Sequence, residues 1–253
     1  VAGSFYNIDR NFLAKELCFS RINKNSIDGV SDRDFIIDLA NCIATSMMHL
    51  SRLSEELILW SSEEFDFINL PDNVVTTSSM MPQKRNPDYP ELIRGKFGRT
   101  IGNLVSILTM LKALPLSYNR DMQEDKEPIF DSLDTYASSV EVMSEIIRGT
   151  DFNKKALIDS ASGNILATDL ADILTLKGIP FREAHIAISK LTNKLEKEGK
   201  SISDLSGSDL SKILGEDIEI DINISINSRN IVAGTSENRV KEEIKAAKKI
   251  LNI

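Results

Sequence analysis

Three long stretches in the first 150 residues repeat apolar side chains at every third or fourth position. In residues 31–60 these side chains fall on one face of a single helix: Phe35, Ile36, Leu39, Ile43, Met47, Leu50, Leu53, Leu57 and Trp60. About 30 residues at roughly 1.5 Å per residue make a rod of about 45 Å. Because a rod this long must cover its apolar face with neighbouring helices, the pattern predicts a helical bundle.

The second and third stretches supply such neighbours. One carries Leu92, Ile93, Phe97, Ile101, Leu104, Leu108 and Leu111, and the other carries Ile129, Leu133, Tyr136, Val140, Met143 and Ile147. Asp88 followed by Glu91 is typical of a capping box at the start of the second helix. The breadth of the apolar faces favours burial between subunits as well, so we expect an oligomer; a self-contained monomeric bundle is the alternative.

From about residue 155 the helical segments become shorter, which predicts two domains, residues 1–155 and 156–253. Helical patterns cover 167–178, 181–199 and 237–251. Residues 217–227 alternate apolar and polar side chains, which by period alone predicts a strand.

The bulk properties narrow the classes of partner. A net charge of -8 argues against nucleic acid or an anionic membrane as the main partner. No apolar run approaches the roughly 18 residues of a membrane span. The two cysteines, Cys18 and Cys42, form neither a disulfide framework nor a metal-binding spacing, so we expect a cytoplasmic protein. No nucleotide-binding or metal-binding motif is present, and no metal or cofactor is predicted.

A polar, proline-bounded loop, TTSSMMPQKRNP (76–87), interrupts the helical pattern. Pro82 and Pro87 fix φ and remove N–H donors, so a helix cannot continue through it. Its hydroxyl groups, the Lys84 ammonium and the Asn86 amide precede a helix N-terminus, where anions are favoured. The loop therefore suits a carboxylate ligand, although composition alone favours a solvated loop with a helix cap.

A second polar segment, LSYNRDMQEDKEP (116–128), joins the second and third helical stretches. Gln123 and Lys126 are three residues apart and share a face if that segment is helical. With Tyr118 they would also suit a carboxylate. An ordinary charged turn between helices is the alternative.

Taken together, these segments resemble a known enzyme family. SSMMPQKRNP (78–87) is similar to the GSSxMPxKxN signature of the fumarase/aspartase superfamily. Within that superfamily, NSIDGVSDRDF, HLSRLSEELILW, LPLSYNRDMQEDKE, ATDLADIL and GIPFREAH resemble segments of the argininosuccinate lyase family. The resemblance runs from Val1 to about Val240.

The resemblance implies a lyase that cleaves argininosuccinate to arginine and fumarate by β-elimination, without a metal or organic cofactor. It implies an all-α fold, in which a long-helix domain forms a homotetramer around a central helical bundle and a small helical C-terminal domain follows. Each active site is then shared between subunits. At 217–227 the family favours helix or irregular structure over the strand. The alternatives are another fumarate-releasing lyase such as adenylosuccinate lyase, or a non-catalytic oligomerisation fragment.

The family's functional residues can be carried over by position. Its catalytic serine matches Ser78, one of two proton-transfer groups, and Lys84 matches the lysine that stabilises an aci-carboxylate. The substrate-binding residues match Asn86, Tyr118, Gln123 and Lys126.

The sequence departs from the family pattern in two ways. Thr77 stands where the signature has glycine, so the loop is expected to be stiffer or differently shaped. In addition, the resemblance implies that about 200 residues precede Val1 in the family, including the catalytic histidine, which neither His49 nor His185 matches.

Overall fold

The computed structural model describes residues 1–77, 80–81 and 83–253, and the chain divides into two compact units, Val1–Phe152 and Asn153–Ile253. The first unit contains α1 (Arg10–Glu16), α2 (Ser26–Ser31), α3 (Asp34–Trp60), β1 (Ile68–Asn69), η1 (Asp72–Val74), β2 (Thr76–Thr77), β3 (Arg85–Asn86), α4 (Asp88–Leu111), η2 (Arg120–Asp125), α5 (Lys126–Gly149) and β4 (Asp151–Phe152). Helices dominate both units, so the predicted all-α fold class is confirmed.

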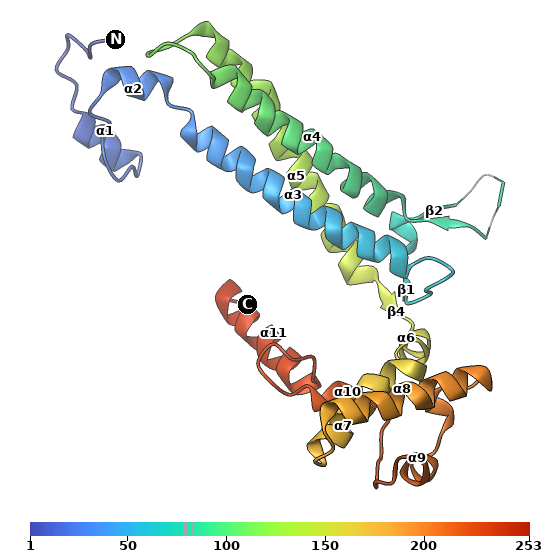
Figure 1. Cartoon of the computed structure of the whole chain (residues 1–253). Helices are drawn as coiled ribbons and strands as arrows, with labels where there is room; N and C mark the ends of the chain where they lie inside the picture. The colour runs from blue at the N-terminus through green and yellow to red at the C-terminus, as the bar shows by residue number, and fades with distance from the viewer. Residues whose placement is uncertain (78–79, 82) are drawn as a thin grey trace. The chain divides into compact units, whose positions relative to one another are not determined.

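Helices α3, α4 and α5 lie side by side and form the bundle of the first unit (Figure 1). Their core is divided into two clusters. One joins the start of α3 to the end of α4 and the start of α5: Ile36, Ala40, Ala44, Leu104, Ile107 and Ile129. The other joins the end of α3 to the start of α4 and the end of α5: Leu57, Ile68, Leu70, Val74, Ile93, Met143 and Ile146. Helix α4 therefore runs antiparallel to α3 and α5.

The predicted capping box at the start of α4 is wrong. The N-cap position is Pro87, which has no side-chain cap hydrogen bond, and Asp88 is already helical. The Asp88 carboxylate instead accepts a hydrogen bond from Thr76 Oγ1 at 2.5 Å. The Asp88 carboxylate, which the spacing of Asp88 and Glu91 predicted to cap the helix, is thus used in a contact with Thr76.

The second unit contains α6 (Lys154–Ser160), η3 (Gly163–Leu166), α7 (Ala167–Leu176), α8 (Phe181–Lys197), η4 (Ile202–Asp204), α9 (Gly207–Leu214), α10 (Ile222–Ser228) and α11 (Glu237–Leu251). Its core gathers side chains of α7, α8 and α9, among them Leu170, Leu174, Ile188 and Leu210. Helix α11 contributes no buried residue. The predicted boundary between residues 155 and 156 stays a prediction.

The strand expected from the alternation at 217–227 is wrong, and the helix or irregular structure implied by the family resemblance is present. Residues 222–228 form α10, because the Asp221 side chain caps its first turn by accepting from the Ile224 N–H at 2.8 Å. The alternation of apolar and polar residues carries no information about this capping contact.

Candidate active site

The described ends of the signature loop form a short two-stranded hairpin. Strands β2 and β3 pair antiparallel, with Thr76 opposite Asn86 and Thr77 opposite Arg85. The hairpin leaves the bundle at the start of α4 and extends away from the helices (Figure 1). Sequence reasoning predicted only a loop here, since strands of two residues give no periodic signal.

Ser78, the predicted proton-transfer residue, lies outside the described residues, as do Ser79 and Pro82. Thr77, the departure from the family signature, lies in β2. A β-branched residue favours such extended backbone, so the threonine suits the position it occupies here.

Contacts at the base fix where the hairpin leaves the bundle. Arg85 donates from Nη1 to Asp72 Oδ1 at 2.6 Å and from Nη2 to the Leu70 carbonyl at 2.8 Å. The segment before β2 also packs closely on the end of α5, where a Cβ added to Gly149 would lie 2.8 Å from the Pro71 side chain. Glycine at 149 thus permits the approach that positions this segment.

Two predicted site residues share this hairpin. Lys84 is exposed, and Asn86 is half-buried on β3. The Lys84 N–H donates to the Met81 carbonyl at 3.0 Å. An ammonium and an amide therefore lie two residues apart at the end of the bundle that is formed by the second core cluster.

Tyr118, Gln123 and Lys126 lie at the connection between α4 and α5. Gln123 is in the 3₁₀ helix η2 and Lys126 is the first residue of α5, and all three side chains are exposed. Residues three apart in a 3₁₀ helix are nearly eclipsed, so Gln123 and Lys126 fall on one side of the segment. The backbone of Ser117, just before Tyr118, has a φ of 75°, a conformation that is costly for a residue other than glycine.

The structure does not bring the two groups of predicted residues together within one chain. Lys84 and Asn86 precede α4, whereas the other three residues follow it. Helix α4 has 24 residues, so at about 1.5 Å per residue it separates the groups by roughly 36 Å. A single site that uses both groups must therefore draw them from different chains.

Sequence reasoning missed a buried charge at the second group. Asp125 is fully buried, and its carboxylate contacts both Arg33 and Lys126. The sequence shows that Asp125 directly precedes Lys126, a predicted site residue. It does not show that Asp125 is buried.

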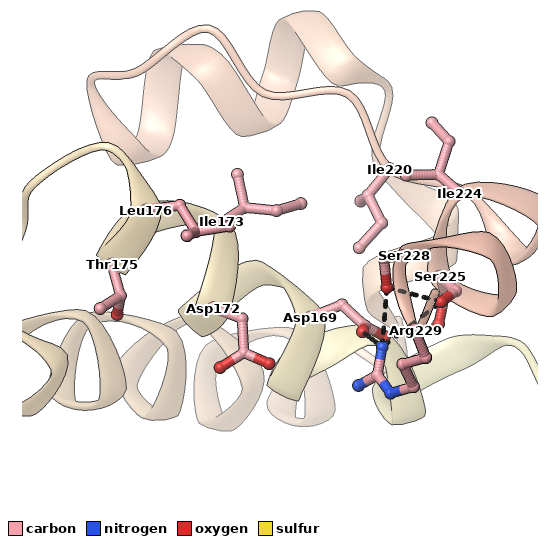
Figure 2. Close-up of a pocket in the computed structure, with 10 residues that line it drawn as sticks. All are labelled: Asp169, Asp172, Ile173, Thr175, Leu176, Ile220, Ile224, Ser225, Ser228 and Arg229. Carbon is pink, nitrogen blue, oxygen red and sulfur yellow. Dashed lines mark hydrogen bonds and ion pairs between the residues drawn. The ribbon is translucent and has the colours of Figure 1, made fainter. Parts of the chain in front are cut away.

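The C-terminal unit holds a separate pocket of about 430 Å³, lined by α7 on one side and by residues 220–229, which include α10, on the other (Figure 2). Its buried Asp169 accepts from Ser225 Oγ at 2.6 Å and forms an ion pair with Arg229. These bonds attach α10, which has no buried residue of its own, to α7. None of the predicted site residues that the structure describes lines this pocket, so we assign its polar groups to holding α10.

Two further searches apply to residues 1–77, 80–81 and 83–253 only. No helix there combines the length and apolarity needed to cross a membrane. No group of three or more His, Cys, Asp or Glu side chains in those ranges is arranged to hold a metal ion.

Comparison with known families gives the class of protein first. A lyase family model matches residues 1–102, and a model described as argininosuccinate lyase C-terminal matches residues 164–233. Among solved structures, an EDDS lyase variant with bound fumarate has a TM-score of 0.85 at 27% identity, over 99% of this chain and 53% of that chain. The family models and the fold place the chain in the lyase class.

Curated relatives narrow the class to one family. The argininosuccinate lyase of Trichlorobacter lovleyi is 46% identical over 97% of this chain, and that of Ruthia magnifica is 48% identical over 99%. The chain belongs to the argininosuccinate lyase family, as the resemblance in its sequence predicted. It spans about half the length of these relatives, 55% and 54% respectively.

Proposed function

We propose that the protein to which this chain belongs cleaves argininosuccinate to arginine and fumarate by β-elimination. The observation that carries the proposal is the identity of 46–48% to argininosuccinate lyases across nearly the whole chain. The neighbouring EDDS lyase structure with bound fumarate supports a dicarboxylate product in a related fold.

The residues divide into two roles in this proposal. Ser78 transfers a proton, and the Lys84 ammonium stabilises the doubly negative aci-carboxylate that forms when the carbon next to a carboxylate loses its proton. Asn86, Tyr118, Gln123 and Lys126 bind the substrate, because amide, phenol and ammonium groups donate hydrogen bonds to carboxylates.

Helix α4, roughly 36 Å long, lies in the chain between Lys84 and Lys126, and this separation supports a site shared between chains. The outer face of α4 supports assembly: Ile101, Val105 and Leu108 are exposed on it. Gly98 lies seven residues before Val105 and so on the same side of the helix, and an added Cβ at Gly98 would meet no atom within 4 Å, as is also true of Gly95 and Gly102. An apolar face with small residues allows another helix to approach closely. We propose a cytoplasmic homotetramer in which these faces are buried.

The test is fumarate release, measured with argininosuccinate and with adenylosuccinate as the parallel substrate, on the full-length protein. Release from argininosuccinate alone is the expected result. Release from adenylosuccinate alone would contradict the choice of substrate. Release from neither would contradict the lyase proposal and favour a non-catalytic helical protein.

The matched variant is Ser78→Ala. Loss of a proton-transfer group is expected to lower kcat by about 10²–10⁴-fold. Turnover at the wild-type rate would remove Ser78 from the mechanism, whatever the substrate.

A further inference from the structure

The connection between α4 and α5 contains a buried carboxylate to which the proposed function gives no role. Asp125 is 0% exposed and lies between two cations. Its Oδ2 accepts from Arg33 Nε at 2.6 Å, and its Oδ1 accepts from Lys126 Nζ. Arg33 directly precedes α3, so one carboxylate joins the start of α3 to the first residue of α5.

A capping role does not explain Asp125. It occupies the N-cap position of α5, where aspartate is favoured because its carboxylate can accept from an N–H of the first turn. No such side-chain bond forms. Both carboxylate oxygens are directed to the cations instead, so the residue serves Arg33 and Lys126 rather than the helix terminus.

The contact between Asp125 and Lys126 is unusual for consecutive residues. Side chains at adjacent positions of a helix do not face each other. Here they meet where the chain changes from the 3₁₀ helix η2 to the α-helix α5. The Lys126 side chain is 55% exposed, and an exposed lysine otherwise samples many rotamers. The buried carboxylate restricts where its ammonium can lie.

We propose that Asp125 is a positioning residue for Lys126. It holds the ammonium at the end of the bundle where the substrate carboxylate is bound, and Arg33 holds Asp125 in turn. The inference rests on the proposed function, since it assumes that Lys126 binds substrate. A preorganised ammonium loses less conformational freedom when it binds, so the effect falls on substrate binding.

The first experiment compares Asp125→Asn with Asp131→Asn in the full-length enzyme. Asp131 lies in the first turns of α5, six residues after Asp125, and pairs with Arg99, so its substitution removes the same charge nearby without touching Lys126. Asp125→Asn is expected to raise KM for argininosuccinate about tenfold with a smaller change in kcat, and Asp131→Asn to leave both within about twofold. A fall in kcat with KM unchanged would overturn the proposal.

A coupling experiment separates positioning from a structural role. Each substitution is combined with Lys126→Ala. If Asp125 acts through Lys126, Asp125→Asn has no further effect on KM in the Lys126→Ala background. Independent, multiplying effects of the two substitutions would show that Asp125 does not act through Lys126.

A readout without turnover keeps the inference separate from the proposed function. In this experiment the folded enzyme is treated with an acetylating reagent. Mass spectrometry then gives the rate of acetylation of Lys126 divided by that of Lys112, an exposed lysine used as the reference. A carboxylate that holds the Lys126 ammonium shields it, so Asp125→Asn should raise the ratio several-fold and Asp131→Asn should not. An unchanged ratio in Asp125→Asn overturns the pairing even if the enzyme is active. Conversely, a raised ratio in a protein that releases no fumarate contradicts the proposed function alone.

Asp125→Asn can fail to fold, because it leaves a buried site without its charge. Arg33→Lys then serves as the second variant: it keeps a cation beside the buried carboxylate but removes the Nε donor. It is expected to raise KM in the wild-type background and to have no effect in Lys126→Ala, and an equal effect in both would overturn the proposal.

Discussion

The two ends of the long-helix unit carry similar polar side chains on different supports. At one end, Arg85 and Thr76 attach the base of a hairpin to the bundle, and Lys84 is exposed. At the other end the polar segment lies directly on the core, with Met122 and Asp125 buried beneath the exposed Gln123 and Lys126. In the proposed enzyme we therefore expect the hairpin end to supply Lys84 and the other end to supply a binding surface fixed on the core, with a complete site needing both.

The strongest test of this comparison mixes two inactive variants. Lys84→Ala and Lys126→Ala each damage one end, so each homotetramer should lose most of its activity. In a 1:1 mixture assembled by co-expression, a site that takes the two lysines from different chains is intact in about a quarter of cases. The mixture is therefore expected to recover about a quarter of wild-type activity. Recovery is measured as fumarate release per total protein.

The outcome decides between two arrangements. If both lysines of a site came from one chain, no mixed assembly would contain an intact site. Activity no higher than that of the single variants, in tetramers shown by mass spectrometry to contain both chains, would contradict the shared site. The control is a mixture of wild type and Lys84→Ala.

The next prediction concerns the α4 face between the two ends. Val105 is 54% exposed, and Val105→Glu places a charge where we propose that helices of different chains meet. We expect dissociation to smaller species, seen by light scattering, and at least tenfold lower activity, because the shared sites are lost. Ile213→Glu makes a comparable change on an exposed position of the C-terminal unit. It should leave the tetramer intact; a tetrameric Val105→Glu protein would contradict this interface.

The bundle could be predicted from the sequence because its signal is periodic and long. The repeats at 31–60, 92–111 and 129–147 correspond to α3, α4 and α5, since each buries the same side of many consecutive turns. The same method was wrong at 217–227, where one capping contact from Asp221 decided the structure. Short elements depend on single contacts that a pattern does not record.

The candidate site shows the same limit. Its residue types were recognisable because Lys84, Asn86, Tyr118, Gln123 and Lys126 lie in two compact polar segments. The distance between the segments follows from the length of α4 and could have been estimated from the sequence. The burial of Asp125 could not, because it depends on how Arg33 from a distant part of the chain packs against it.

A smaller effect is expected at the base of the hairpin. Arg85→Ala removes the bond to the Leu70 carbonyl and the ion pair with Asp72, so Lys84 should be placed less accurately and kcat/KM should fall several-fold. Asp72→Asn is the matched control. The Asp72 side chain is 90% exposed, and its substitution leaves the bond to Leu70 in place, so kcat/KM should stay within about twofold. Equal losses in both variants would assign the effect to the ion pair.

The smallest effect is expected at Asp131, on the outside of the connection end. Hydrogen bonds from Arg99 lower the pKa of the Asp131 carboxyl, so the folded state favours its charged form. The resulting stability is present above the ordinary carboxyl pKa of about 4 and is lost as the pH falls through the lowered value. Because the pair is at the surface, Asp131→Asn should lower the free energy of unfolding by only about 0.2–1 kcal/mol at pH 7, and by less at pH 3. Urea unfolding at the two pH values measures this, and a loss that grows toward pH 3 would contradict the assigned cause.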